Sequence, residues 1–91
     1  MNLRDALYNW LQMKIVADAR PEDQAAAETR LFFETILTED HKLTAFSVGE
    51  TTDRYYIVHY ELEARAAVEK FDRELADQLL GEIESNPKYN E

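Results

Sequence analysis

Residues 43–60 read LTAFSVGETTDRYYIVHY, and this stretch decides the fold. Its two halves, 43–48 and 54–60, are rich in β-branched and aromatic residues, a composition that favours β-strands. Between them lies the loop from Gly49 to Asp53, in which one glycine can adopt the positive φ that hairpin loops of four or five residues often need. The stretch therefore predicts a β-hairpin.

Helical patterns precede this hairpin. From Leu3 to about Asp18, apolar residues recur at three- and four-residue spacing, which predicts a helix with one buried stripe. Pro21 interrupts the pattern and suits the first turn of a second helix, which we expect to run to about Thr38. Because the connection between them is short, the two helices are expected to form an antiparallel pair.

A third helix is expected directly after the hairpin, from about Leu62. Acidic and basic residues at i,i+4 spacing support its outer face, at 61 and 65 and again at 69 and 73. The helix is predicted to end either at Gly81, as a left-handed cap, or before Asn86-Pro87. One apolar stripe runs along it, made of Ala64, Ala67, Val68, Phe71, Leu75, Leu79 and Ile83.

These elements predict a single α+β domain over residues 1–91, folded from about 2 to 85, with a flexible tail at 86–91. The expected order is ααββα: an antiparallel helix pair and a third helix packed on a two-stranded β-hairpin.

The composition limits the classes of partner. Nineteen acidic and ten basic residues give a net charge of −9, which repels nucleic acid and anionic membrane surfaces. The absence of cysteine excludes disulfides and thiolate chemistry. The first residues lack the continuous apolar run of a signal peptide or a membrane span. We therefore expect a cytoplasmic protein with no nucleic-acid or membrane partner.

The second predicted strand is apolar on both faces. Alternation places Tyr56, Val58 and Tyr60 on one side, which we expect to be the core side because the helices can easily cover one side only. The other side belongs to a candidate interaction surface, with Leu43 or Phe46 joining it according to the hairpin register. Its residues are Leu43, Phe46, Tyr55, Ile57 and His59.

A two-stranded sheet is marginal by itself, so the exposed apolar side predicts self-association through the hairpin into a homo-oligomer, most simply a homodimer. The alternative is that the first helix covers this side within the same chain.

Acidic residues are frequent on the predicted third helix. A solvated helical face explains them most simply, but they also define a candidate acidic docking face for a basic protein, as in an antagonist that mimics DNA. This face comprises Glu63, Glu69, Asp72, Glu74 and Asp77.

Signals for catalysis are weak. With glycine only at Gly49 and Gly81, the chain has no phosphate-binding glycine loop, and its only histidines are His41 and His59. We therefore predict no catalytic, cofactor-binding or metal-binding residue, and a non-catalytic interaction or regulatory module that binds itself and in some cases another protein. The alternative is a small-ligand-binding protein or minor enzyme that uses His41, Tyr55, His59 and Glu61 in a cleft.

Overall fold

The computed structural model describes residues 1–85, so the predicted flexible tail lies outside the described residues. The structure confirms the α+β class, with three helices and an antiparallel sheet. The elements are α1 (Leu3–Ala19), α2 (Gln24–Thr35), a π-helical turn η1 (Ile36–Asp40), β1 (Leu43–Thr51), β2 (Tyr55–Leu62), β3 (Arg65–Asp72) and α3 (Arg73–Ser85).

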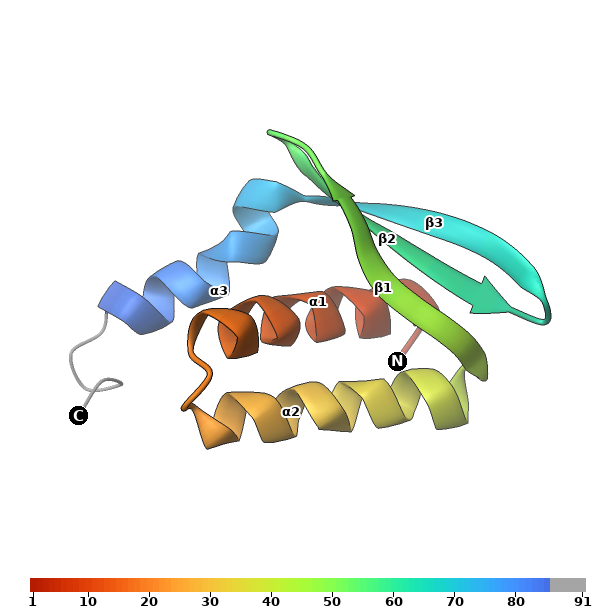
Figure 1. Cartoon of the computed structure of the whole chain (residues 1–91), viewed down its shortest axis with the longest axis horizontal. Coiled ribbons are helices and arrows are strands. Elements are labelled where there is room, and N and C mark those ends of the chain that lie inside the picture. Colours follow the sequence, from red (N-terminus) through yellow and green to blue (C-terminus); the bar gives the residue numbers. More distant parts are fainter. Residues whose placement is uncertain (86–91) are drawn as a thin grey trace.

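The first two helices form the predicted antiparallel pair (Figure 1). Each begins at a side-chain cap: Asn2 accepts a hydrogen bond from the Asp5 amide, and Asp23 accepts one from the Ala26 amide at 3.0 Å. Arg20 pairs with Asp23 at 3.2 Å, which holds the connection between the helices. Pro21 lies in this connection, and α2 begins after Asp23.

The prediction of two strands is wrong, because residues 65–72 form a third strand instead of the first turns of a helix. This strand, β3, pairs with β2 in unbroken register from Leu62↔Arg65 to Tyr55↔Asp72. Glu63 and Ala64 make the two-residue turn between them with positive φ values of 53° and 63°, the backbone of a type I′ hairpin. The last helix therefore begins at Arg73 and continues through Gly81 to Ser85.

The three strands form one sheet in the order β1-β2-β3, and α1 and α2 lie on one side of it (Figure 1). α3 leaves the end of β3 and packs beside the C-terminal half of α1, where Ile83 joins Val16, Ala17 and Ala26 in a small apolar cluster. In the described part of the chain, no helix covers the other side of the sheet.

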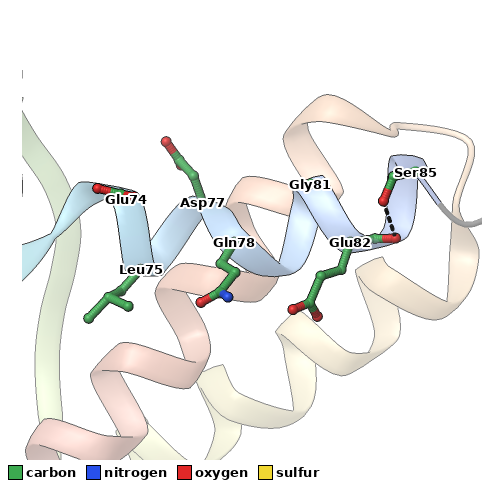
Figure 2. Close-up of a pocket in the computed structure, with 7 residues that line it drawn as sticks. All are labelled: Glu74, Leu75, Asp77, Gln78, Gly81, Glu82 and Ser85. Carbon is green, nitrogen blue, oxygen red and sulfur yellow. Dashed lines mark hydrogen bonds between the residues drawn. The ribbon is translucent and has the colours of Figure 1, made fainter.

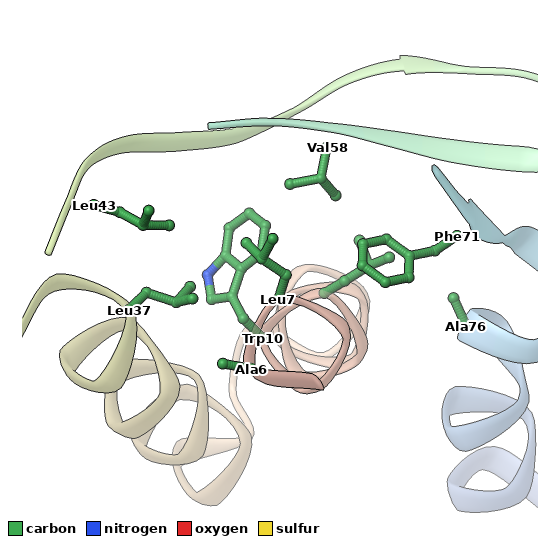
Figure 3. Close-up of a cluster of buried hydrophobic side chains, with 9 residues drawn as sticks. Ala6, Leu7, Trp10, Leu37, Leu43, Val58, Phe71 and Ala76 are labelled. Carbon is green, nitrogen blue, oxygen red and sulfur yellow. The ribbon is translucent and has the colours of Figure 1, made fainter. Parts of the chain in front are cut away.

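The main core fills the space between α1, α2 and the helix-facing side of the sheet (Figure 3). Leu7, Leu37 and Val58 are fully buried there. Trp10 packs edge-on against Phe46, with 5.2 Å between ring centroids, while its indole N–H donates a hydrogen bond to Glu34. Since Val58 is fully buried and its neighbours on alternate positions pack against the core, the prediction that the Tyr56 side of β2 is the core side is confirmed.

Candidate functional site

The side of the sheet away from the helices, here called the open face, is built by strand alternation. On the central strand β2 it carries Tyr55, Ile57, His59 and Glu61, because every second side chain points to the same side. The strand pairing then places neighbours beside them from β1 and β3. These neighbours are Ala45, Ser47, Ala66, Val68, Lys70 and Asp72.

Two residues of the predicted interaction surface do not belong to this face. A register shift between Leu43 and Ala45 lets β1 turn both Leu43 and Phe46 toward the core, opposite Leu62 and Tyr60. Leu43 is only 4% exposed, and Phe46 packs against Trp10. Tyr55, Ile57 and His59 do lie on the open face, so the structure brings together three of the five predicted residues.

The open face carries exposed apolar side chains and little net charge. Val68 is 55% exposed and Tyr55 37% exposed, and Ile57 is half-buried between the flanking strands. Its charged groups are one basic residue, Lys70, and two acidic ones, Glu61 and Asp72, so that most of the chain's charge of −9 lies elsewhere. The Lys70 ammonium lies 4.4 Å from the centroid of the Tyr55 ring, which holds both side chains against the sheet.

The polar groups on this face are tied to their neighbours. The His59 ring lies against Gly49 of β1, so closely that a Cβ atom at Gly49 would overlap the ring carbon Cδ2. The Glu61 carboxylate accepts a 2.8 Å hydrogen bond from the Thr44 hydroxyl. His41 follows η1, beyond the Leu43↔Leu62 pair, whereas His59 lies opposite Ser47. The two histidines therefore occupy separate positions along the sheet.

The two edges of the sheet differ. β1 contains register shifts at both ends, between Leu43 and Ala45 and between Val48 and Thr51. β3 has no shift along its whole length, and within residues 1–85 no strand pairs with its outer edge. Sequence reasoning missed Ala66, Val68 and Lys70 because it assigned them to a helix, and residues 65–72 show no alternation of apolar and polar residues that would indicate a strand.

The predicted acidic docking face is divided among different elements, because residues 63–72 are not helical. Glu63 lies in the β2–β3 turn, and Glu69 points to the helix side of β3, where it pairs with Arg4 of α1. Asp72 caps α3 by accepting a 3.0 Å hydrogen bond from the Leu75 amide. The remaining two members, Glu74 and Asp77, lie on α3.

Asp77 accepts a 2.5 Å hydrogen bond from the Tyr56 hydroxyl. Burial and this neighbouring carboxylate raise the pKa of Tyr56. Asp77 is therefore engaged in holding α3 against the sheet.

A surface hollow of about 580 Å³ lies along α3. Its lining residues within 1–85 all come from this one helix, and Figure 2 shows Asp77 on one side of the helix and Gln78 and Glu82 on another. It is lined by Glu74, Leu75, Asp77, Gln78, Gly81, Glu82 and Ser85. Because no second element closes this hollow, it does not enclose a ligand in the way that a binding cleft does.

Residues 1–85 contain no group of three or more histidine and acidic side chains arranged to hold a metal ion. In the same range, no helix is both long and apolar enough to cross a membrane. Comparison of the chain with family models, curated proteins and solved structures found no significant match.

Proposed function

We propose that this chain is a non-catalytic protein–protein interaction module that self-associates through the strands of its sheet. The observation that supports the proposal most directly is the open face, where Tyr55, Ile57 and Val68 present apolar surface beside an unbulged strand edge. Contiguous apolar surface of this kind marks contact sites in soluble proteins.

The distribution of charge also favours the open face as the contact between copies. Two copies that each carry −9 repel one another, so their contact is most favourable where few acidic groups come together. The open face has nearly balanced charge and gains about 25 cal/mol for each Å² of apolar surface that a partner buries. The sheet therefore offers both a gain from burial and a small electrostatic cost.

A cytoplasmic location belongs to the same proposal. Its support is the cysteine-free composition, which suits a reducing compartment, together with the absence of a membrane-spanning helix in residues 1–85. No described feature favours the small-ligand or DNA-mimic alternatives, because the histidines lie apart and the acidic residues are divided among β3, the turn and α3.

The proposal is tested by sedimentation velocity at micromolar concentrations with Val68→Asp, on the open face of β3, and a matched control. Leu31 on α2 is also an exposed apolar residue, 53% exposed, but it lies on a helix away from the open face, so Leu31→Asp makes the same chemical change elsewhere. We expect dimers for the unmodified chain and for Leu31→Asp, and monomers with unchanged helical circular dichroism for Val68→Asp. An unmodified chain that stays monomeric at every concentration would refute self-association.

A further inference from the structure

The outer edge of β3 lacks several features that normally prevent pairing, and the protection that it does carry is its charged side chains, Arg65, Glu69, Lys70 and Asp72. Proteins protect edge strands with bulges, prolines or very short length. β3 runs without a register shift from Arg65 to Asp72 and contains no proline and no glycine. The first half of this strand is apolar from Ala66 to Val68.

β3 also has less backbone pairing than the central strand β2. It follows two consecutive residues, Glu63 and Ala64, in left-handed conformations that disfavour side chains, and it pairs on one side only. A second strand on its free edge would complete the backbone hydrogen bonds of this segment.

We propose that β3 pairs antiparallel with β3 of a second copy of this chain, in a register centred on Ala67, so that two sheets join into one. The inference rests on the proposed self-association and specifies which contact produces it. A twofold axis perpendicular to the sheet relates the copies, keeps the helices of both on the same side and leaves the joined open faces continuous.

The charged side chains of β3 favour one register for its pairing with the second copy. Under this symmetry only side chains on the same face of the sheet meet, so β3 can be centred on Ala67, Val68 or Glu69 but not between them. Centring on Glu69 places the two copies of that carboxylate against each other, which is unfavourable. Centring on Ala67 instead places Arg65 opposite Glu69 of the second copy, twice by symmetry, and Ala66 opposite Val68 of the second copy.

The position of α3 also favours a register centred on Ala67 over one centred on Val68. Phe71 is buried against the core, and α3 begins at Arg73, so the end of β3 near Asp72 is flanked by a helix. A register centred on Val68 places Arg65 opposite Phe71 of the second copy and leaves Glu69 opposite Ala67, without an ion pair. Centring on Ala67 confines the new pairing to Arg65–Glu69, the part of the strand farther from α3.

The cysteine-free chain allows a direct test by single-cysteine cross-linking, because Ala67→Cys supplies the only thiol. In the proposed register, two copies of residue 67 face each other at about 5 Å between Cβ atoms, close enough for a disulfide after small adjustment. Ser47→Cys on β1 is the matched control, because five strand spacings, about 24 Å, would separate its two copies.

We expect mild oxidation to convert most Ala67→Cys protein into covalent dimer. Ser47→Cys, oxidised for the same time, should remain monomeric under denaturing conditions. Reversing one charge with Arg65→Glu should raise the dimer dissociation constant about tenfold. Dimers without cross-linking at Ala67, or with cross-linking at Val68→Cys instead, would overturn this register while leaving self-association intact. A strictly monomeric unmodified chain would overturn both proposals.

Discussion

The His59 imidazole of β2 lies against Gly49 of β1, and no side chain fits between them. We predict that Gly49→Ala displaces the ring and lowers the free energy of unfolding by about 1 kcal/mol, a modest cost because the exposed ring can swing outward. A double-mutant cycle by urea denaturation measures this contact, and the cost of Gly49→Ala should disappear in the His59→Ala background. An equal cost in both backgrounds would contradict the prediction.

The hydrogen bond from Tyr56 to Asp77 joins the sheet to α3, and we predict that Tyr56→Phe lowers the free energy of unfolding by about 1 kcal/mol at neutral pH. Burial and Asp77 raise the pKa of Tyr56 above the ordinary value of 10.0. The stabilisation linked to this shift is therefore complete below pH 10 and is lost as the pH rises through the higher pKa of the folded state.

Chemical denaturation between pH 8 and about 11 should accordingly show a steeper alkaline loss of stability for the unmodified chain than for Tyr56→Phe. Parallel curves for the two proteins would show that Tyr56 does not titrate in this way.

Asp23 links α1 to α2, and its substitution should change the acid stability of the chain. The hydrogen bond from the Ala26 amide and the ion pair with Arg20 lower the pKa of Asp23 from 3.8. A carboxylate with a lowered pKa stabilises the fold above its unfolded pKa, and this contribution is lost as the pH falls through the folded value. We predict that Asp23→Asn keeps the helix cap. Between pH 5 and pH 2, the urea concentration at its unfolding midpoint should fall less than that of the unmodified chain.

Asp23→Ala is the companion variant, because it removes the cap as well. It should unfold at lower urea concentration than Asp23→Asn at pH 7, where the charge of the unmodified residue is fully developed. If the two variants behave identically at every pH, the cap contributes nothing.

The parts of the fold that were predictable from sequence are those where local and tertiary preferences agree. The stripe of α1 and the alternation of β2 each appear in the sequence as they do in the structure. The core side of β2 followed from the number of helices available to cover it, and Val58 occupies the position this argument gives it.

The segment 62–72 was not predictable, because its local preference opposes its structure. Its alanines and its i,i+4 charge pairs favour a helix, and its turn at Glu63-Ala64 lacks the asparagine or glycine that marks a two-residue hairpin. The helix assigned to this segment also removed β3 from the predicted interaction surface. The bulge near Thr44 added a second error, because a one-residue shift turns Leu43 to the core. Neither a bulge nor an unmarked turn has a reliable signal in a single sequence.

Burial distinguishes two leucines that the helical patterns treat alike. Leu7 is fully buried beneath the sheet, whereas Leu75 on α3 is 54% exposed. We predict that Leu7→Ala lowers the free energy of unfolding by about 3 kcal/mol, because it removes buried methyl groups and leaves a cavity, while Leu75→Ala changes it by less than about 0.5 kcal/mol. Urea denaturation of both variants measures the difference, and similar costs would place Leu75 in a contact that the monomer does not show.

The β2–β3 turn allows a test of whether residues 65–72 form the strand β3 or the helix that their sequence favours. Glu63 and Ala64 both have positive φ, a conformation that costs roughly 1 to 2 kcal/mol for a residue with a Cβ atom and much less for asparagine or glycine. The double substitution Glu63→Asn with Ala64→Gly should therefore stabilise the fold by about 1 to 2 kcal/mol in urea denaturation. The same changes in a helix would destabilise it, because asparagine and glycine are weaker helix formers than the residues they replace.

The direction of the effect thus separates the two structures for this segment. A matched control is Ala27→Gly in α2, where the residue is helical and the same Ala-to-Gly change should lower the free energy of unfolding by about 1 kcal/mol. Losses of stability at both sites would show that residues 63 and 64 do not adopt the left-handed turn, and β3 would then lack the edge on which pairing between copies depends.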